Sequence, residues 1–504
     1  MAWWIIEHRE IQHSAMKRNV DHVSFNSRHS QNERTADYSV SLASVILGMA
    51  GKQEMKCCYS CSRAVAFDVA LVSASSIHIS GWTPAPSSST ILLETAMNRS
   101  ITLVLFLLTV APSFSQELIW QKTYGGMDKD YGQALVPLDD GGFMIAGWTA
   151  SYRANPKARS SLYVVRTNRD GDTLWQRDLS TFHHAEARAI FDIGGNQFRI
   201  IGMAVETDAG PGHLQRIYVA TIDADGNMLS EKVLGDTVDN ANVWCVRRTS
   251  DGGYVLCGNL YQHVMIAKLD SGGALSWQRA FGVTRGNYDH AQGVRETSDG
   301  GFVLAGHSAG APAIRQDAIL MKVDSQGDSL WARLIRGDSS EIGYDVIERP
   351  GGGLLLAGFS DSQGYPGENS KLYIVRTSRD GVVESIATPG SLANSQIYLV
   401  ERTNDGGLIM VGAGGGDGSQ RDMLLVKTDA EGRLQWEKTF EVAPDWMSVG
   451  LSIQQLADNT YVIVGYGGPG RAGVEAIEML LMRISDRPSV VRVQGERPSI
   501  MELW

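Results

Sequence analysis

One short phrase recurs along the chain and constrains its fold more than any other feature. In each copy, a turn with Gly-Gly or an equivalent pair is followed by four mostly apolar residues and a final glycine, as in DGGFVLAG. Consecutive copies are 48 to 56 residues apart, and their final glycines are Gly147, Gly202, Gly258, Gly306, Gly358, Gly412 and Gly465. A repeat of about this length with several short strands is typical of folds that stack one supersecondary unit on the next.

The fourth copy shows how such a unit is expected to fold. We expect strands over residues 290–297, 302–306, 318–323 and 329–333, with glycine-containing turns after the first and third of them. The second and third strands are nearly continuous apolar runs, which indicates burial on both faces, as in a sheet packed between two neighbours. Gly, Asp and β-branched residues are too frequent for a helix. The repeat therefore predicts four-stranded units in an all-β chain.

A second phrase, D-x-x-G-x-x-x-W, marks the turn into the fourth strand of a unit. We expect its tryptophans to pack between neighbouring sheets, and with the matching residue of an N-terminal strand they are Trp120, Trp175, Trp277, Trp331 and Trp436. Ser230 and Ser385 replace the tryptophan in the second and fifth units. The Asp-Gly turns resemble calcium loops but lack the 12-residue series of ligands, so hairpin turns are favoured.

The two ends of the repeat array complement each other in sequence. The seventh unit stops after Glu478–Ile484 without a fourth strand, while the strand-like segment Glu117–Lys122 precedes the first unit. Pairing this segment into the last unit would remove the exposed strand edges that an open array would leave. The sequence thus predicts a seven-bladed β-propeller of four-stranded blades over residues 116–486, closed by the N-terminal strand.

The repeats resemble the DGG-type propeller repeats of secreted bacterial proteins from about Glu117 to Ile484. This resemblance implies the fold and says little about activity. The D-x-x-G-x-x-x-W phrase also looks like the tryptophan-docking motif of quinoprotein propellers, whose alcohol dehydrogenases are typically eight-bladed and in some cases carry vicinal cysteines beside the quinone. This chain has seven units and no vicinal cysteines in its repeats. We predict no cofactor, and calcium and pyrroloquinoline quinone are left open.

A signal-peptide pattern lies inside the chain, at residues 97–115. A short basic start is followed by the apolar core Ile101–Val110 and by small residues before a cut at Gln116. We expect a secreted or periplasmic protein whose mature form has no stable membrane span. Residues 1–96 are expected to be a mis-called or disordered extension upstream of a true start at Met97; the rival interpretation is a leader domain followed by an internal anchor. Residues 487–504 form a short tail.

The net charge argues against some macromolecular partners, and the cysteine positions bear on a disulfide and a metal site. The net charge of −11 opposes binding to nucleic acid or to anionic membranes, and we expect a monomer. Cys245 and Cys257 flank one hairpin, where either a cross-strand disulfide or two buried thiols would fit. Three cysteines cluster within residues 57–61, but no second cluster completes a metal site, so no metal is predicted.

No catalytic motif for a nucleophilic serine, a zinc protease or a phosphate loop is present. The pair His183 and His184 is expected to be exposed to solvent. Charged residues on the innermost strands, including Arg247, Arg295 and Glu401, suit either a channel mouth or ordinary solvation. Function is expected on the loops between second and third strands, because rigid blades position them. Candidate ligand-binding residues on those loops are Tyr152, Arg153, His213, Arg315, Tyr365 and Arg471.

These patterns favour an exported binding or scaffold protein that recognises a glycan or a protein through loops on one face. The alternative is a propeller enzyme, either a polysaccharide lyase or hydrolase or a quinone-dependent dehydrogenase. A third interpretation is a piece of a larger surface protein. A further interpretation is that the loops between second and third strands have no binding role and only connect the strands in solvent.

Overall fold

A computed structural model describes residues 116–152, 158–205, 214–235, 240–283, 288–309, 315–361, 370–392, 394–415, 421–469 and 476–486. All of them belong to one compact unit, Leu92–Trp504. These residues form 28 strands and contain no helix, so none of them forms a helix able to cross a membrane. The predicted extension, signal peptide and tail lie outside the described residues.

The strands form seven four-stranded antiparallel sheets, called blades 1 to 7. Blade 1 contains β2 (Asp130–Pro137), β3 (Phe143–Thr149), β4 (Ser161–Thr167) and β5 (Thr173–Asp178); blade 2 contains β6 (His184–Gly194), β7 (Gln197–Val205), β8 (Arg216–Asp223) and β9 (Met228–Leu234). Blade 3 contains β10 (Ala241–Arg248), β11 (Tyr254–Leu260), β12 (His263–Leu269) and β13 (Leu275–Phe281); blade 4 contains β14 (Tyr288–Glu296), β15 (Phe302–Ala309), β16 (Gln316–Val323) and β17 (Ser329–Ile335). Blade 5 contains β18 (Glu341–Glu348), β19 (Leu354–Ser360), β20 (Lys371–Thr377) and β21 (Val383–Ala387); blade 6 contains β22 (Gln396–Arg402), β23 (Leu408–Gly414), β24 (Asp422–Thr428) and β25 (Leu434–Phe440). Blade 7 contains β26 (Trp446–Gln455), β27 (Thr460–Pro469), β28 (Glu478–Ser485) and β1 (Glu117–Tyr124).

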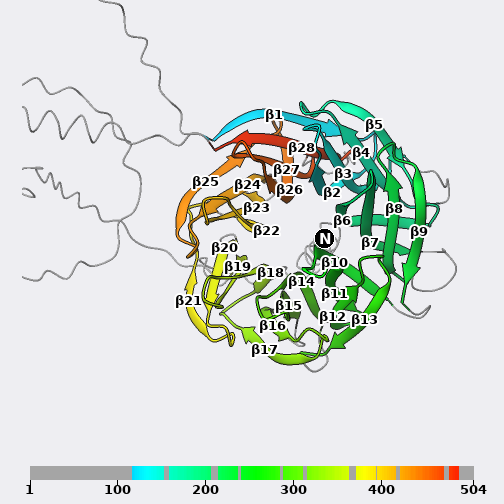
Figure 1. Cartoon of the computed structure of the whole chain (residues 1–504). Coiled ribbons are helices and arrows are strands. Elements are labelled where there is room, and N and C mark those ends of the chain that lie inside the picture. The colour runs from blue at the N-terminus through cyan, green and yellow to red at the C-terminus, as the bar shows by residue number, and fades with distance from the viewer. Residues whose placement is uncertain are drawn as a thin grey trace, which may run out of the picture. The chain divides into compact units, whose positions relative to one another are not determined.

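Figure 1 shows the blades arranged around a common axis, with the first strand of each blade innermost and the fourth outermost. β2 of blade 1 packs against β6 of blade 2 on one side and against β27 of blade 7 on the other, so the ring is closed. The predicted seven-bladed β-propeller is confirmed.

Closure occurs through the N-terminal strand. β1 pairs antiparallel with β28, from Glu117 opposite Ser485 to Tyr124 opposite Met479. In Figure 1, β1 (cyan) lies beside β28 (red), so the two ends of the propeller are joined within one sheet. The closure expected from the incomplete seventh unit is confirmed, and it leaves no unpaired edge on β28.

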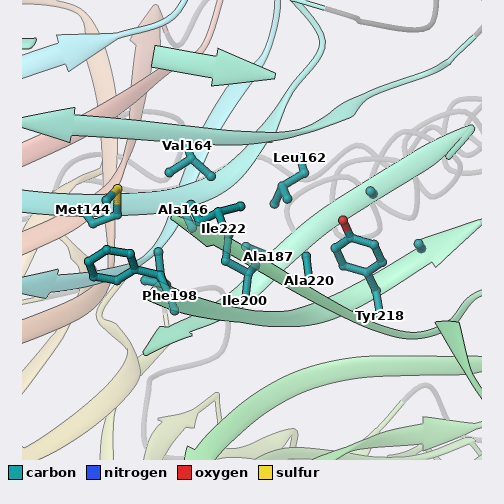
Figure 2. Close-up of a cluster of buried hydrophobic side chains, with 14 residues drawn as sticks. Met144, Ala146, Leu162, Val164, Ala187, Phe198, Ile200, Tyr218, Ala220 and Ile222 are labelled. Carbon is teal, nitrogen blue, oxygen red and sulfur yellow. The ribbon is translucent and has the colours of Figure 1, made fainter. Parts of the chain in front are cut away.

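Apolar side chains fill the space between adjacent blades. Between blades 1 and 2, residues from β3 and β4 meet residues from β6, β7 and β8, as Figure 2 shows. The labelled members are Met144, Ala146, Leu162, Val164, Ala187, Phe198, Ile200, Tyr218, Ala220 and Ile222. All are at most 3% exposed. Because each blade faces two such cores, its middle strands are apolar on both faces, which explains their continuous apolar runs.

In five blades an aspartate of the first hairpin turn joins that turn to the third strand. In blade 4, Asp299 accepts a hydrogen bond from the amide of Gly301 (3.0 Å) and pairs with Lys322 Nζ at 2.7 Å. The lysine stem is buried while its ammonium group meets the carboxylate at the surface. The same pairing recurs in four other blades, as Asp140 with Arg166, Asp251 with Lys268, Asp405 with Lys427 and Asp458 with Arg483.

The repeated tryptophans contact the neighbouring blade. Trp120, Trp175, Trp277 and Trp331 each lie against the glycine of the D-x-x-G turn in the next blade, at Gly171, Gly226, Gly327 and Gly381 respectively. Trp175 Nε1 also donates to the carbonyl of Ala224 (3.1 Å), and Trp436 packs onto the core between blades 6 and 7. Each of these four turn glycines has a positive φ and leaves room for the indole, so one glycine serves both the turn and the interface.

Every innermost strand carries a β-bulge opposite the final glycine of the repeated phrase. In blade 4, the register shifts between Ala291 and Gly293, and a side chain on the opposing Gly306 would overlap the carbonyl oxygen of His290. The bulged residues of the seven blades are Gln133, Arg188, Trp244, Gln292, Tyr344, Tyr398 and Leu451. The repeated glycine is therefore required by a close approach of two backbones. Bulges of this kind redirect side chains and are frequent beside functional sites.

Candidate functional site

The axis of the ring has two chemically different ends. The hairpin end carries the DGG turns, whereas the loop end is where second strands stop and third strands begin. Within each innermost strand, residues before the bulge lie toward the loop end and residues after it lie toward the hairpin end. The bulge thus separates two layers of side chains near the axis.

Four tyrosines from four blades gather at the loop end, and we call them the tyrosine cluster: Tyr131, Tyr344, Tyr398 and Tyr466. The rings of Tyr131 and Tyr466 are 4.4 Å apart, and those of Tyr344 and Tyr398 are 4.9 Å apart and edge-to-face. Tyr344 and Tyr398 are bulged residues of blades 5 and 6, so the bulge brings them to the cluster. Residues far apart in the chain thereby form one aromatic surface.

Two further aromatic rings extend this surface. Trp148 stacks on Tyr131 with centroids 4.5 Å apart, and Phe359 lies 6.0 Å from Tyr344. Trp148, Phe359 and Tyr466 each directly follow the final glycine of a repeat, in the loop-end half of a second strand. Their position confirms that the tyrosine cluster belongs to the loop end of the axis.

One guanidinium group acts on the tyrosine cluster. Burial raises the pKa of Tyr344 and of Tyr466, the neighbouring tyrosines raise it further, and Arg421 lowers it. Burial also raises the pKa of Tyr398, and Arg421 again opposes the rise. Arg421 directly precedes β24, so its backbone lies at the loop end of blade 6.

The hydroxyls of the tyrosine cluster differ in their hydrogen bonding within the described residues. Tyr398 donates to Gln396 Oε1 (2.9 Å), whereas the hydroxyls of Tyr131, Tyr344 and Tyr466 have no hydrogen-bond partner among the described residues. The three side chains are 3 to 8% exposed, so the cluster presents only the edges of its rings. Aromatic walls with a few polar groups are the usual chemistry of a small-ligand site.

On the hairpin side of the bulge lies a network of paired charges. Asp345, which is 1% exposed, accepts hydrogen bonds from Arg247 Nη2 (3.2 Å) and Arg295 Nη2 (2.9 Å). Glu401 pairs with the same two guanidinium groups at 3.3 and 3.1 Å. Burial alone would raise the pKa of Asp345, but Arg295 and Arg247 lower it below its ordinary value. The four residues come from blades 3, 4, 5 and 6 and hold these blades together.

The sequence had singled out three members of this network as a channel mouth or as solvated residues. Arg247, Arg295 and Glu401 pair with one another and with Asp345, which sequence reasoning had not noticed. The adjacent Glu296 turns away from the axis and accepts hydrogen bonds from Ser250 of the preceding blade. Glu348 and Ser298 repeat this contact one blade further on.

The histidine pair is not exposed, so that prediction is wrong. His183 is 8% exposed, and His184 Nδ1 forms a hydrogen bond with Ser160 Oγ while its Nε2 is 3.8 Å from Glu186 Oε2. Burial lowers the pKa of His184. Ser160, His184 and Glu186 are in the order of a nucleophile, a base and a carboxylate. However, Ser160 is 3% exposed, and Glu186 pairs with Arg188. The arrangement joins blades 1 and 2 and does not favour catalysis.

A second histidine pair lies at the loop end of blade 4. His290 and His307 are cross-strand neighbours whose rings stack with centroids 5.1 Å apart. Burial lowers the pKa of His307 to about 3, with His290 contributing, so this imidazole is neutral at physiological pH. In the part of the chain that the structure describes, no three His, Cys, Asp or Glu side chains gather into a metal-binding group.

The two cysteines of the propeller are direct cross-strand partners in blade 3. Cys245 lies opposite Cys257, and the two sulfurs are unbonded. A hydrogen bond from Cys257 lowers the pKa of Cys245, and Arg247 adds to the effect, whereas burial raises the pKa of Cys257. The structure thus shows two adjacent free thiols beside the charge network.

Few of the ligand-binding residues predicted from sequence can be placed. The hydroxyl of Tyr152 donates to the carbonyl of Gly125 (2.8 Å), and its ring packs on Tyr163 within blade 1. Arg315 is exposed directly before β16. The other four residues, Arg153, His213, Tyr365 and Arg471, lie outside the described residues. The tyrosine cluster was missed because its members sit at strand ends and bulges; aromatic residues next to the repeated glycine were the available signal.

The fold and this site define a seven-bladed β-propeller with an aromatic loop end. No protein-family model matches the chain, and no curated protein matches it. Among solved structures, it is similar to streptogramin B lyase (10% identity over 73% of this chain and 98% of that chain, TM-score 0.44). It is also similar to Sqt1 from Chaetomium thermophilum (12%, 74% and 99%, TM-score 0.41) and to the β-propeller domain of the Trilobed protease from Pyrococcus furiosus (12%, 75% and 100%, TM-score 0.40). Such low identities and TM-scores carry no functional argument.

Proposed function

We propose that this propeller is a binding protein that recognises a glycan at its loop end. The tyrosine cluster is the observation that supports this proposal. Sugars present apolar C–H faces and hydroxyl edges, and tyrosine offers both an apolar ring and a polar tip. The hydroxyls of Tyr131, Tyr344 and Tyr466, which lack partners among the described residues, are suited to the hydroxyl edge of a saccharide.

Binding is favoured over catalysis at two buried carboxylates, Asp345 and Glu186, because both are paired with arginines. A glycosidase needs a carboxylic acid whose pKa is raised so that it can donate a proton. One buried carboxylate next to the axis, Asp345, has two arginine partners and a lowered pKa, whereas burial raises the pKa of Asp130 and of Asp422. Glu186 is held by Arg188. The polysaccharide lyase or hydrolase and the quinone-dependent dehydrogenase are therefore the alternatives.

We also propose that the protein is exported through the segment 97–115. Its basic start, short apolar core and small residues before Gln116 support this proposal. Expression in a bacterial host, followed by N-terminal sequencing of the periplasmic and secreted fractions, tests it. A mature N-terminus at Gln116 is expected; a protein retained whole in the cytoplasm would contradict export.

The binding proposal is tested by a thermal-shift screen of the full chain against neutral and acidic oligosaccharides, calcium and pyrroloquinoline quinone. A ligand present at about 100 times its Kd stabilises by roughly 2.7 kcal/mol, which gives a visible shift. We expect a shift with one saccharide class, and we expect the double variant Tyr344→Phe, Tyr466→Phe to lose it, because both rings remain and only hydroxyls are removed.

Tyr152→Phe is the matched control, since it removes a hydroxyl that is bonded within blade 1. A saccharide shift that is lost in this control and kept in the double variant would place binding at the loop residues predicted from sequence. A shift with the quinone instead would overturn the binding proposal in favour of an oxidoreductase. No shift with any saccharide would leave a protein ligand as the remaining candidate.

A further inference from the structure

Arg421 differs from the other arginines near the axis. Arg247 and Arg295 each pair with two carboxylates, and Arg188 pairs with Glu186. Among the described residues, Arg421 forms no ion pair, although its side chain is half-buried. A half-buried cation without a counter-ion is costly to keep, so such a group invites an anionic partner from outside the chain.

The backbone at Arg421 is fixed between two blades. Its carbonyl accepts a hydrogen bond from the amide of Ser448 in blade 7 (2.8 Å), and Ser448 Oγ accepts one from the amide of Met423 (2.8 Å). Arg421 is therefore presented from an anchored position at the start of β24. Fixing the donor in advance reduces the entropy lost when a ligand binds.

The adjacent carboxylate does not neutralise Arg421. Asp422 is the next residue, and successive side chains on a strand point to opposite faces. Burial and then Glu441, on the side of the outer strand β25, both raise the pKa of Asp422. No ion pair joins Asp422 to Arg421 within the described part of the chain. Arg421 lies beside the tyrosine cluster, because Ser448, whose amide bonds to its carbonyl, directly precedes Val449, the cross-strand partner of Tyr466.

Building on the proposed glycan site, we propose that its ligand is an acidic saccharide whose carboxylate binds Arg421 while the sugar lies against the loop-end edge of the tyrosine cluster. A planar guanidinium can bind a carboxylate with two parallel hydrogen bonds, and a neighbouring tyrosine hydroxyl can donate a further one. Since the chain carries a net charge of −11, long-range attraction does not assist the anion. Recognition would depend on this one local contact.

The test is calorimetric titration of the full chain with oligogalacturonate, alginate and hyaluronan oligomers, each compared with its methyl ester. The ester keeps the sugar backbone and removes the charge. We expect one acid to bind at least tenfold more tightly than its ester. In Arg421→Gln, affinity for the acid is expected to fall about 10- to 100-fold, the usual effect of losing a hydrogen bond to a charged group, with affinity for the ester unchanged.

Arg433→Gln is the matched control. Arg433 lies in the same blade at the hairpin end, is 72% exposed, and its replacement makes the same change in net charge. Acid binding should be unaffected in this variant. If both arginine variants weaken binding equally, the effect is one of net charge and the role of Arg421 is overturned.

The remaining outcomes separate the inference from the proposed function. Equal affinity for acid and ester, with no effect of Arg421→Gln, would overturn the acidic ligand while the glycan site stands. Tighter binding of a glutamate-rich peptide than of any saccharide would overturn the saccharide class while keeping the carboxylate contact. Failure to bind any acidic or neutral saccharide would overturn both proposals. A melting curve of Arg421→Gln, matched to that of the parent chain, shows that the variant is folded.

Discussion

The hairpin end and the loop end of the ring follow opposite rules. At the hairpin end, blade after blade repeats the same solution: an aspartate pairs with a basic residue of the third strand, and a glutamate reaches the turn of the preceding blade. At the loop end, the positions beside the repeated glycines differ from blade to blade, and the hydroxyls of Tyr131, Tyr344 and Tyr466 have no partner among the described residues. Contacts that recur in successive blades therefore stabilise the fold, whereas residues that differ between blades are the candidates for binding a ligand.

The largest effect is expected from opening the ring itself. Deleting Glu117–Thr123 removes the strand that pairs with β28 along its length and also removes Trp120 from the interface with blade 1. We expect a loss of about 5 kcal/mol or more, with both ends of the ring affected, because every blade depends on closure. Denaturant unfolding monitored by tryptophan fluorescence measures it. A truncated chain that melts like the parent would contradict the closure.

The next largest effect is expected at the boundary between the two ends. Gly306→Ala places a methyl group against the carbonyl oxygen of His290, which cannot move without disturbing the bulge. We expect destabilisation of about 3 kcal/mol, as for other overpacked sites. Gly272→Ala is the control, because only the flexible side chain of Asp270 lies near that position, and it should cost less than about 0.5 kcal/mol. Equal costs at both positions would show that the bulge does not need glycine.

Oxidation is expected to join Cys245 and Cys257, which lie directly opposite each other beside the bulge. A disulfide there should raise the free energy of unfolding by about 2 kcal/mol, because it lowers the conformational entropy of the unfolded chain. Mass spectrometry after mild oxidation, with melting curves of both forms, measures the effect. If both thiols stay alkylatable after oxidation, the second interpretation of the sequence, two independent thiols, is the correct one.

A smaller effect is expected from the repeated aspartates of the hairpin end. Burial would raise the pKa of Asp299, but Lys322 and Thr297 hold it at about 2, and Lys427 and Thr403 do the same for Asp405. Because these values lie below the ordinary value of about 3.9, the stabilisation is complete above about pH 4 and is lost as pH falls toward 2.

Since Asp299 is largely exposed, we expect only about 1 kcal/mol or less for each pair after solvent screening. Asp299→Asn should flatten the fall in melting temperature between pH 4 and pH 2. A parent chain whose melting temperature does not change over that range would contradict these pairings.

The smallest effect on stability is expected at the loop end. Arg421 has no ion pair among the described residues, so Arg421→Gln should change the free energy of unfolding by less than about 0.5 kcal/mol. Chemical denaturation of both proteins measures this difference. A loss above 1 kcal/mol would mean that Arg421 serves the fold, as the hairpin-end residues do, and would weaken the contrast between the ends.

The repeat made most of the fold predictable. Periodic glycines, apolar runs and the missing fourth strand of the last unit predict the blades and their closure, because each pattern reflects backbone geometry that every blade shares. The site was less accessible. Tyr131 and Tyr466 lie at opposite ends of the propeller sequence, and a bulge brings Tyr344 to the cluster. Contacts between non-equivalent positions of different blades follow from ring closure and bulge geometry, which composition and spacing do not encode.

Closure by β1 also has a consequence for how the chain acquires its structure. β1 is the first strand of the propeller to be synthesised, yet its partner β28 is the last, so this sheet cannot form until the whole propeller sequence is available. Contacts this distant in sequence are slow to form because the intervening chain must first be ordered. Blades 1 to 6 have all four of their strands in one continuous stretch and can assemble as they emerge. The final pairing therefore requires the complete propeller sequence, since a chain interrupted before Glu478 leaves β1 without a partner and the ring open.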